Sequence, residues 1–435
     1  MNKHHFRGGI HPPEHKNTPG AAIENLPPGG TVVLPLSQHL GAPARPLVAP
    51  GDRVRTGQLI AEAAGRVSAN IHASVTGKVI ALEARPHPNG QNAPAIVIAA
   101  EDPDDPVPFT PHQPDELSDA ELLELIQQAG IVGLGGAAFP THVKLAPPQE
   151  QRVDTLIVNA CECEPYLTCD HRVLLEESAA VLGGVRIAMR LLRAETAYIG
   201  IEDNKPDAIA HWQQLLAGQS RIKLVGLRTK YPQGSEKQLI QALTRRTVPS
   251  GKLPLDVGCV VQNVQTLKAI DDAVRLGKPL YERVLTVTGR VNRPANLRVR
   301  LGTPLAAVIE HCGGFSSETV QKVIAGGPMM GIAQWTLEVP VVKGTSGVLV
   351  LAAEDARTQP TTHCIRCGKC VNACVMGLIP TQISRLVDKE MVEELKDYHP
   401  LDCLECGCCA YLCPAKLPLL QQLKLAKAML RKNKN

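Results

Sequence analysis

Aromatic side chains and net charge are both scarce in this chain. Phe, Trp and Tyr together make up 3% of the 435 residues, and the formal net charge at pH 7 is only +4. Proteins that bind nucleic acids usually carry a clustered basic surface, often with aromatic side chains on which bases stack. Neither feature stands out here, so the sequence argues against a nucleic-acid-binding protein.

Long apolar runs are also missing. No uninterrupted apolar stretch approaches the ~18 residues that a membrane-spanning helix requires. The basic start MNKHHFRGG has no apolar segment behind it, so we expect neither a membrane span nor a secretory signal peptide. The chain contains 14 cysteines. In a protein that is not secreted, their thiolates should remain reduced and available to bind metal.

Two cysteine-rich runs near the C-terminus share one spacing. CIRCGKCVNAC and CLECGCCAYLCP both follow C-x2-C-x2-C-x3-C. This spacing is typical of bacterial two-cluster ferredoxins, in which the fourth cysteine of each run binds the cluster of the other run. We therefore predict two [4Fe–4S] clusters, one held by Cys364, Cys367, Cys370 and Cys413, and the other by Cys403, Cys406, Cys409 and Cys374.

Disulfides and structural zinc are the alternative uses of these cysteines. A disulfide framework is typical of small secreted domains, and zinc usually takes paired C-x2-C knuckles or Cys/His sets. Two details depart from the ferredoxin pattern. Val375 stands where a proline is expected after the first run, whereas Pro414 follows the second. Cys408 lies beside Cys409, so the choice of ligand there rests on spacing alone.

The remainder of the chain divides according to its pattern of strands, turns and helices. We predict a small β domain at 1–112, and an α/β domain with helices on the faces of its sheet at 115–278. A β-grasp-like module at 279–355 and a helical two-cluster ferredoxin domain at 356–435 follow. A Pro- and Asp-rich linker precedes the α/β domain, whose first helix should begin after Ser118 and stop at Gly130. The predicted fold class is therefore multidomain α/β.

A glycine-rich segment of the α/β region, GIVGLGGAAFPTHVKL, has groups suited to a phosphate. Gly133, Gly135 and Gly136 would let backbone amides approach a phosphate closely, and Lys144 would add a positive charge. A Rossmann fingerprint should follow a strand and open a helix. These glycines follow a predicted helix instead, so a plain surface loop is the alternative.

A second segment, NACECEPYLTCDHR, follows a buried-looking strand. Polar groups at the carboxyl end of such a strand face the crevice in which α/β sheets bind ligands. Glu162 and Glu164 could there hydrogen-bond ribose hydroxyls or a carboxamide. The spacing of Cys161, Cys163 and Cys169 matches no standard metal site, which favours buried thiols over a further metal.

Taken together, these motifs resemble a known family. GLGGAAFPT…K, NACECEP…DHR, YPQGSEKQLI and VVQNVQTLKAI occur in the same order as the flavin- and NADH-binding motifs of the flavin subunit of complex I. VAPGDRVRTGQLIAE resembles the barrel-sandwich hybrid fold of biotinyl and lipoyl carriers, and GGPMMG resembles the signature of the SLBB type of β-grasp module. With two ferredoxin runs added, nearly the whole chain resembles the RnfC family, which supplies one component of the Rnf electron transport complex.

The resemblance implies a noncovalent FMN and a site for NAD(H). The residues that it places around the flavin and the dinucleotide are Gly133, Gly135, Gly136, Phe139, Lys144, Asn159, Glu162, Glu164, Tyr231, Gly234, Glu236, Asn263 and Thr266. Phe139 would offer a face on which the nicotinamide nucleotide stacks. The chain departs from the complex I pattern at four pocket positions, where Leu134 replaces an arginine, Ala138 a glycine, Cys161 an aspartate and Ser235 a glutamate.

The resemblance also implies a function. The chain would exchange a hydride between NAD(H) and FMN and pass single electrons through the two clusters, as a peripheral subunit at the cytoplasmic face of the bacterial inner membrane. Ion translocation would belong to integral membrane partners, and an iron–sulfur ferredoxin-like subunit is a further expected partner. The alternatives are an iron–sulfur adaptor without NADH activity, a diaphorase subunit of a soluble hydrogenase or dehydrogenase, and a quinone-reductase subunit.

The last residues can form an amphipathic helix with a basic face, LPLLQQLKLAKAMLRKNKN. Such a helix could touch a membrane surface or a partner. Packing on its own domain, with the basic face in solvent, is the favoured interpretation.

Overall fold

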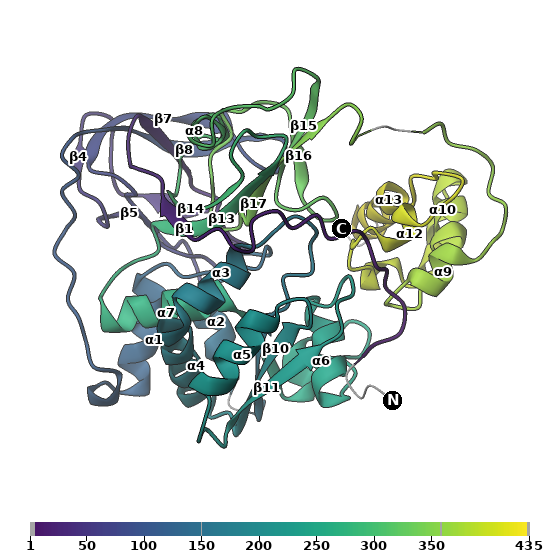
Figure 1. Cartoon of the computed structure of the whole chain (residues 1–435), viewed down its shortest axis with the longest axis horizontal. Helices are drawn as coiled ribbons and strands as arrows, with labels where there is room; N and C mark the ends of the chain where they lie inside the picture. Colours follow the sequence, from purple (N-terminus) through teal and green to yellow (C-terminus); the bar gives the residue numbers. More distant parts are fainter. Residues whose placement is uncertain (1–4, 149, 357–358, 433–435) are drawn as a thin grey trace.

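The computed structural model describes residues 5–148, 150–356 and 359–432 of the chain. Figure 1 shows a larger body of sheets and helices and a separate lobe formed by the C-terminal helices. In the described ranges, no helix combines the length and apolar character that a membrane span requires.

The N-terminal β domain consists of two small sheets. Their strands are β2 Thr31–Pro35, β8 Asn92–Ala100, β7 Gly77–Pro86 and β4 Arg53–Val54 in one sheet, and β3 Arg45–Pro46, β5 Leu59–Glu62 and β6 Ile71–His72 in the other. Inward-facing side chains such as Leu34, Ile60 and Ile98 are fully buried. Short strands broken by Gly and Pro thus form a β sandwich, as the sequence predicts.

The β-grasp module forms one six-stranded sheet with the start of the chain. The sheet order is β1 Ile23–Asn25, β14 Ala295–Arg300, β13 Glu282–Gly289, β17 Gly347–Ala352, β15 Val320–Ala325 and β16 Ile332–Gln334. Helix α8 Leu305–His311 belongs to the same module. One apolar core extends from Val32 and Ile98 of the β sandwich to Leu285 and Val350 of this sheet. The two modules are therefore joined by a shared hydrophobic core.

The N-terminal segment before β1 leaves the β sandwich and crosses the molecule. Strand β1 pairs in parallel with β14, with Ile23 opposite Asn296. Closer to the N-terminus, Ile10 forms a bridge with Tyr231 of the α/β domain, and the amide of Gly9 donates to the carbonyl of Ala373 in the C-terminal lobe, 2.9 Å away. Residues 6–18, here named the N-terminal strap, thus contact the α/β domain and the C-terminal lobe.

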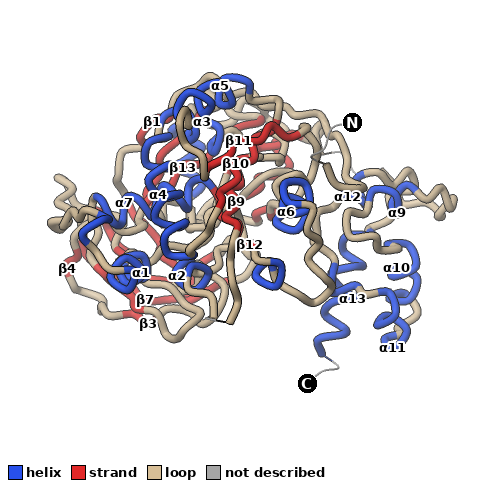
Figure 2. The backbone as a smooth tube through the Cα atoms, turned by 90° about the horizontal axis from the view of Figure 1, so that it is seen from below, coloured by secondary structure: helices blue, strands red, loops and turns tan. Residues whose placement is uncertain are grey.

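The α/β domain has a four-stranded parallel sheet in the order β11 Ile222–Leu227, β10 Thr196–Glu202, β9 Thr155–Ala160 and β12 Cys259–Asn263. Helices α3 Cys169–Glu176, α4 Ser178–Leu192, α5 Pro206–Leu215 and α7 Val264–Arg275 pack on one side and α6 Glu236–Thr244 on the other. Figure 2 shows both layers. Along β9, Leu156 and Val158 enter one core while Ile157 enters the other, as expected for a strand buried on both faces.

Local sequence signals explain two helical features. Helix α1, Asp119–Gln128, begins with a capping box in which Ser118 and Glu121 each accept the other's backbone amide, and it ends before Gly130, whose φ is +66°. The predicted start and stop are confirmed. Helices α4 and α7 approach so closely that a Cβ on Gly184 would collide with the carbonyl of Leu267. Glycine is therefore required at this position.

The C-terminal lobe consists of short helices around two small cores. Its helices are α9 Lys369–Ala373, α10 Pro380–Asp388, α11 Val392–Leu395, α12 Cys408–Tyr411 and α13 Leu419–Lys432. Leu423, Ala426 and Leu430 of α13 are buried against α10 and α11. The amphipathic C-terminal helix therefore packs on its own domain, which was the favoured interpretation; Asn433 and the residues after it lie outside the described range.

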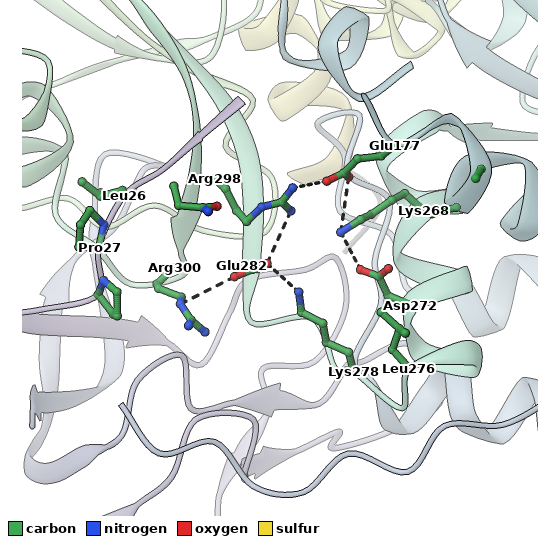
Figure 3. Close-up of a pocket in the computed structure, with 14 residues that line it drawn as sticks. Leu26, Pro27, Glu177, Lys268, Asp272, Leu276, Lys278, Glu282, Arg298 and Arg300 are labelled. Carbon is green, nitrogen blue, oxygen red and sulfur yellow. Dashed lines mark hydrogen bonds and ion pairs between the residues drawn. The ribbon is translucent and has the colours of Figure 1, made fainter. Parts of the chain in front are cut away.

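A charged cavity of about 730 Å³ lies where the β sandwich, the α/β domain and the β-grasp module meet. Figure 3 shows its wall of ion pairs. Glu282 is the centre of this network, with Lys278 Nζ 2.7 Å, Arg298 Nη1 3.6 Å and Arg300 Nε 3.7 Å from its carboxylate oxygens. Arg300 also binds Asp104, 3.0 Å away, next to the β sandwich. The cations and carboxylates pair with one another, so the wall serves to hold three modules together.

Glu282→Gln should weaken this junction. The Glu282 side chain is only 12% exposed, and removing one member of a buried ionic network leaves its partners uncompensated, at a cost of about 3 kcal/mol. We expect the free energy of unfolding, measured by urea titration, to fall by about 3 kcal/mol in this variant. Glu195→Gln is the matched control, because the ion pair of Glu195 with Arg152 is exposed and should contribute under about 1 kcal/mol.

The same variant should change the pH dependence of stability. Burial acts to raise the pKa of Glu282, but Lys278, Arg298 and Arg300 outweigh it and hold the pKa below the usual 4.5. The stabilisation is therefore present above pH 4.5 and is lost as the pH falls through the lowered pKa. Equal acid sensitivity of the wild type and the Glu282→Gln variant would contradict this role.

Candidate functional site

The candidate site lies at the carboxyl edge of the parallel sheet. Asn159 near the end of β9 and Asn263 at the end of β12 are register partners on adjacent strands. Strand β9 pairs with β10 on one side and with β12 on the other. The chain passes from β9 to β10 and β11 first, and then returns to form β12 on the opposite side of β9. This is the topological switch point, the place at which open α/β sheets bind ligands.

The glycine-rich loop lies beside Asn263. Thr266 accepts the amide hydrogen of Leu134 at 2.9 Å, and the amide of Gly133 donates to the carbonyl of Phe139 at 2.8 Å. A Cβ on Gly135 would lie 3.3 Å from the Cβ of Asn263, whereas Gly136 is exposed and has open space around it. Helix α2, Thr141–Leu145, follows the loop. An exposed backbone without side chains is a surface to which a phosphate can approach closely.

Ala138 is one of the departures from the complex I pattern, and its backbone conformation matches the glycine that it replaces. Its φ is +50°, in the left-handed region that glycine adopts most easily. The loop therefore keeps its turn in spite of the substitution.

Two further pairs of predicted site residues are in contact. Lys144 Nζ lies 2.6 Å from Glu236 Oε1 at the start of α6. The side-chain amide of Asn159 donates to the carbonyl of Gly234 at 2.8 Å, and the amide of Gly234 donates to Cys163 Sγ at 3.3 Å. The structure thus brings residues from four separate motifs to one edge of the sheet.

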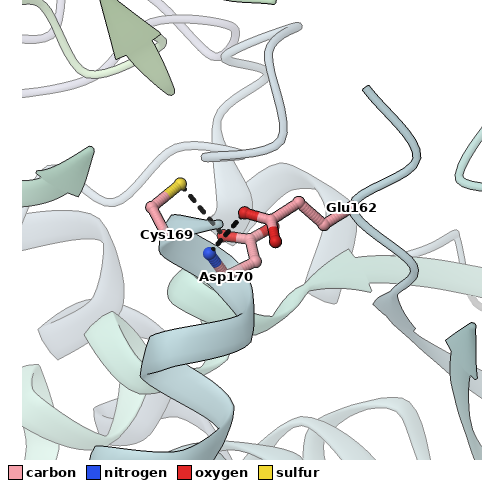
Figure 4. Close-up of side chains that lie close together, drawn as sticks. All are labelled: Glu162, Cys169 and Asp170. Carbon is pink, nitrogen blue, oxygen red and sulfur yellow. Dashed lines mark hydrogen bonds between the residues drawn. The ribbon is translucent and has the colours of Figure 1, made fainter. Parts of the chain in front are cut away.

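Glu162 caps a helix. Its carboxylate accepts the amides of Asp170 and His171, at 2.7 and 3.3 Å, at the start of α3. Figure 4 shows Glu162, Cys169 and Asp170 converging, with potential ligand atoms within 4.8 Å of one another. Asp170 in turn accepts from the side-chain amides of Asn263 and Gln265. These hydrogen bonds account for the convergence without a metal, and a contact of Glu162 with the flavin stays a prediction.

Glu164 joins the site to the β-grasp module. Its two carboxylate oxygens accept the amides of Met329 and Met330, at 3.0 and 2.8 Å, from the GGPMMG segment. A side chain on Gly327 would collide with this carboxylate, so glycine is required there. Burial raises the pKa of Glu164 to about 7, although the two amides oppose the shift. Its contact with a dinucleotide stays a prediction.

Two lysines that the sequence analysis missed bind the loop that carries Glu162 and Glu164. Lys16 of the N-terminal strap donates to the carbonyls of Glu162, Glu164 and Leu167, at 3.0, 3.1 and 2.5 Å. Lys205, whose side chain is 1% exposed, donates to the carbonyl of Cys161 at 2.6 Å. Lys16 lies about 146 residues before the loop in sequence. No spacing or periodicity in the sequence signals this contact.

The residues at this edge fit a flavin mononucleotide. The site offers an exposed glycine backbone, a lysine and two asparagine side chains, which are donors for a phosphate and for the polar edge of a ring system. Phe139 is partly exposed beside the loop. Its stacking role stays a prediction.

The four cysteines predicted for the second cluster line one cavity of the C-terminal lobe. Cys374 comes from the first run, and Cys403, Cys406 and Cys409 come from the second. The arrangement is the one that crossed ligation requires. The predicted partners of the first cluster also meet across the runs, since Cys370 and Cys413 belong to one buried group. The second set therefore fits a cubane cluster, and for the first set the structure shows only that Cys370 and Cys413 meet, in a group that also contains Cys409. The individual ligands stay predictions.

The two cysteine turns have the same backbone. The third residue of each turn is left-handed, with φ +56° at Arg366 and +59° at Glu405, and each turn continues into a left-handed glycine and a short helix. The amides of Arg366 and Glu405 point to the sulfurs of Cys364 and Cys403, at 3.4 and 3.3 Å. Amide hydrogen bonds to ligand sulfurs are among the factors that set cluster potentials.

The second turn packs directly against the candidate flavin site. Tyr231, which is 1% exposed, donates its hydroxyl hydrogen to the carbonyl of Cys406 at 2.9 Å. Ile10, Tyr231, Ala373 and Cys408 form one buried group, against which Cys163 and Met329 pack. The second cysteine set is thus the one next to the flavin site. Cys364 and Cys367 of the first set are exposed.

Comparison with known proteins agrees with this architecture. Family models match residues 4–103 (RnfC barrel sandwich hybrid domain), 126–272 (Nuo51 FMN-binding domain), 284–333 (SLBB domain) and 363–417 (4Fe-4S dicluster domain). The chain is 49% identical to the C subunit of the proton-translocating ferredoxin:NAD(+) oxidoreductase complex of Clostridium ljungdahlii, over 97% of this chain and 93% of that protein. The chain belongs to the RnfC family.

A second relative in this family is similar over its full length. The C subunit of the Na(+)-translocating ferredoxin:NAD(+) oxidoreductase complex of Acetobacterium woodii is 45% identical, with 98% of both chains covered. A solved structure, an NAD+-reducing [NiFe]-hydrogenase in the H2-reduced state, has a TM-score of 0.50 at 17% identity. The match covers 74% of this chain and 62% of that one. At that identity the likeness concerns the fold alone.

These matches confirm several predictions from the sequence. The order of the four folds and the assignment of FMN and two [4Fe–4S] clusters as cofactors are confirmed by the domains that match. The boundaries at residues 112, 278 and 355 stay predictions.

Lys16→Met should impair the use of NADH more than the binding of flavin. The substitution keeps the apolar stem but leaves three carbonyls of the Glu162–Leu167 loop without their donor, each at a cost of about 1–3 kcal/mol. We expect the KM for NADH in ferricyanide reduction to rise about tenfold, with flavin content retained. Lys78→Met, at an exposed lysine of β7, is the control. An unchanged KM would remove Lys16 from this role.

Cys374→Ser should remove the cluster of the second run rather than that of its own run. Cys374 lines the cavity with Cys403, Cys406 and Cys409, so its loss should reduce bound iron from about eight to about four per chain. Electron paramagnetic resonance of the reduced protein would identify the remaining cluster. Cys408 lines the same cavity but lies outside both predicted sets, so Cys408→Ser should retain both clusters. Loss of the first-run cluster alone would show that crossed ligation is wrong.

Proposed function

We propose that this chain is the NAD(H)- and flavin-carrying subunit of an ion-translocating ferredoxin:NAD⁺ oxidoreductase complex, peripheral to the membrane on its cytoplasmic side. When bound, FMN exchanges a hydride with NAD(H), and the two [4Fe–4S] clusters carry electrons one at a time. Ion translocation belongs to integral membrane partners of the same complex. Family membership and the four matching domains support this function.

The observation that carries the proposal is the contact between Tyr231 and Cys406. It joins the flavin site to the second cysteine turn, with the hydroxyl of Tyr231 2.9 Å from the carbonyl of Cys406. Gln238 in α6 adds a second link, donating to the carbonyl of Val375 at 3.3 Å. These hydrogen bonds keep the second cluster site near the nucleotide site.

The remaining residues have positioning roles in this proposal. The glycine loop and Lys144 receive the flavin phosphate, while Asn159 and Asn263 orient the flavin at the switch point. Phe139 stacks on the nicotinamide nucleotide. Glu164 fixes the GGPMMG segment by accepting the amide of Met329. This segment contacts the second turn, since a Cβ built on Gly407 would lie 3.4 Å from the carbonyl oxygen of Met329.

The test is anaerobic stopped-flow mixing of the flavin- and cluster-loaded chain with NADH. We expect loss of flavin absorption first and of cluster absorption second. In Tyr231→Phe the second phase should be slowed on the order of fivefold relative to the first, since loss of one hydrogen bond weakens the docking contact by ~1 kcal/mol. Loaded protein whose flavin and clusters are inert to NADH would favour the adaptor function.

A further inference from the structure

Two buried cations lie behind the glycine-rich loop of the candidate flavin site. Arg283 on β13 is 3% exposed, and Lys343 is fully buried. Neither forms an ion pair with a carboxylate in the ranges that the structure describes; both donate to backbone carbonyls instead. Burying a cation is costly unless acceptors or an opposite charge replace the lost solvent. The carbonyls supply acceptors, but the two positive charges are not neutralised.

Arg283 joins the loop to the segment that carries Lys343. Its Nη1 donates to the carbonyl of Lys343 at 2.5 Å, and its Nη2 donates to the carbonyl of Leu134 at 3.4 Å. Burial lowers the pKa of Arg283, and the nearby Cys169 and Asp170 partly oppose this shift. The carboxylate of Asp170 is itself hydrogen-bonded to two side-chain amides and makes no ion pair with Arg283. The guanidinium therefore keeps its positive charge next to the loop.

Lys343 holds the start of the same loop. Its Nζ donates to the carbonyls of Asn70 and Gly130, at 2.6 and 2.7 Å. The turn that carries this lysine, residues 342–345, packs on the loop, since a Cβ built on Gly344 would lie 3.3 Å from the carbonyl oxygen of Gly136. Both cations thus bind the loop from its buried side, at points before and after Gly133.

The side chains near Lys343 supply no negative charge. Burial, and then the charge of Lys343, lower the pKa of His39 to about 4 and that of His72 to about 3. Both imidazoles are therefore neutral at pH 7. Burial lowers the pKa of Lys343 to about 7. An anion on the other side of the loop would offset the cost of burying this ammonium group.

The contact of Arg283 also orients an amide of the loop. The C=O and N–H groups of a trans peptide point in opposite directions. Because Arg283 binds the carbonyl of Leu134 from the buried side, the amide of Gly135 points away from Arg283. Gly135, Gly136 and Ala137 are exposed, and their amides have no acceptor in the described part of the chain. Successive free amides of this kind form a concave site for an anion.

We propose that Arg283 and Lys343 are positioning residues of the flavin site, whose buried charges attract the phosphate of FMN and whose hydrogen bonds keep the loop amides directed at it. This inference rests on the proposed function, in which the glycine loop receives the flavin phosphate. The phosphate supplies the negative charge that the surroundings of the two cations lack. Charges in the protein interior interact more strongly than in water, so neither cation needs to touch the flavin.

The test compares FMN with riboflavin, which has the same ring system but no phosphate. The full-length chain, with both clusters loaded and the flavin removed, is titrated with each compound, and quenching of flavin fluorescence gives the Kd. In Arg283→Met we expect the Kd of FMN to rise at least about tenfold and that of riboflavin to change less than about twofold. Lys343→Met keeps the apolar stem and should show the same selective loss, so it provides the test where Arg283→Met does not fold.

Arg246→Met is the matched control. Arg246 has its own carboxylate partner, Asp154, 2.7 Å away and just before β9 at the opposite edge of the sheet. Its replacement should leave the Kd of both flavins unchanged. Phosphorus-31 nuclear magnetic resonance of bound FMN provides a second measurement. The phosphate resonance should move in Arg283→Met and in Lys343→Met, and should stay at its wild-type position in Arg246→Met.

Failure of this inference and failure of the proposed function give different results. Equal weakening of FMN and riboflavin, or an unchanged Kd of FMN, would overturn the role of Arg283 and Lys343 in phosphate binding. A wild-type chain that binds no FMN, or whose bound FMN is not reduced by NADH, would overturn the proposed function instead.

Discussion

The candidate site depends on two ammonium groups that bind the backbone of the loop between β9 and α3. Lys16 and Lys205 arrive from different parts of the chain and together donate to four carbonyls of residues 161–167. Burial lowers the pKa of Lys16, and the nearby Glu162 partly opposes the shift. Removing a cation from water is costly unless acceptors replace the lost solvent. The loop carbonyls supply these acceptors and are themselves held in place.

The two glutamates of this loop bind different parts of the molecule. Glu162 turns back to cap α3, while Glu164 turns outward and binds the β-grasp segment. Cys163 receives the amide of Gly234 and packs near the second cysteine turn. One short loop therefore contacts the α/β domain, the β-grasp module and the C-terminal lobe. Its position brings the candidate flavin site and the second cysteine turn side by side.

Much of the chemistry could be predicted from the sequence. The cysteine spacing is informative because a cubane has fixed geometry, so three ligands must come from one tight turn and the fourth from elsewhere. The start and stop of α1 were predictable because a capping box and a left-handed glycine act within a few residues. The order of motifs indicated the flavin site, and the structure brings Asn159, Gly234, Asn263 and Thr266 together as that order implies.

Other features could not be predicted because they depend on partners distant in sequence. The pairing of β1 with β14 and the contacts of Lys16 join residues more than 140 positions apart, and local pattern carries no information on such pairs. The helix-capping role of Glu162 was missed for a related reason. A carboxylate beside a ligand crevice and one that caps the next helix have the same sequence context.

The amino-acid sequence by itself determined the two cluster motifs and the succession of four folds, because spacing, periodicity and turn chemistry are local properties. The polar residues of the flavin site stay predictions. Only the tertiary structure decided which cysteine turn is covered and which is exposed. The two turns have nearly the same backbone, and they differ because Tyr231 and Met329 bury the second, while Cys364 and Cys367 of the first are exposed. Packing between distant segments, rather than the motif, gives the two turns different surroundings.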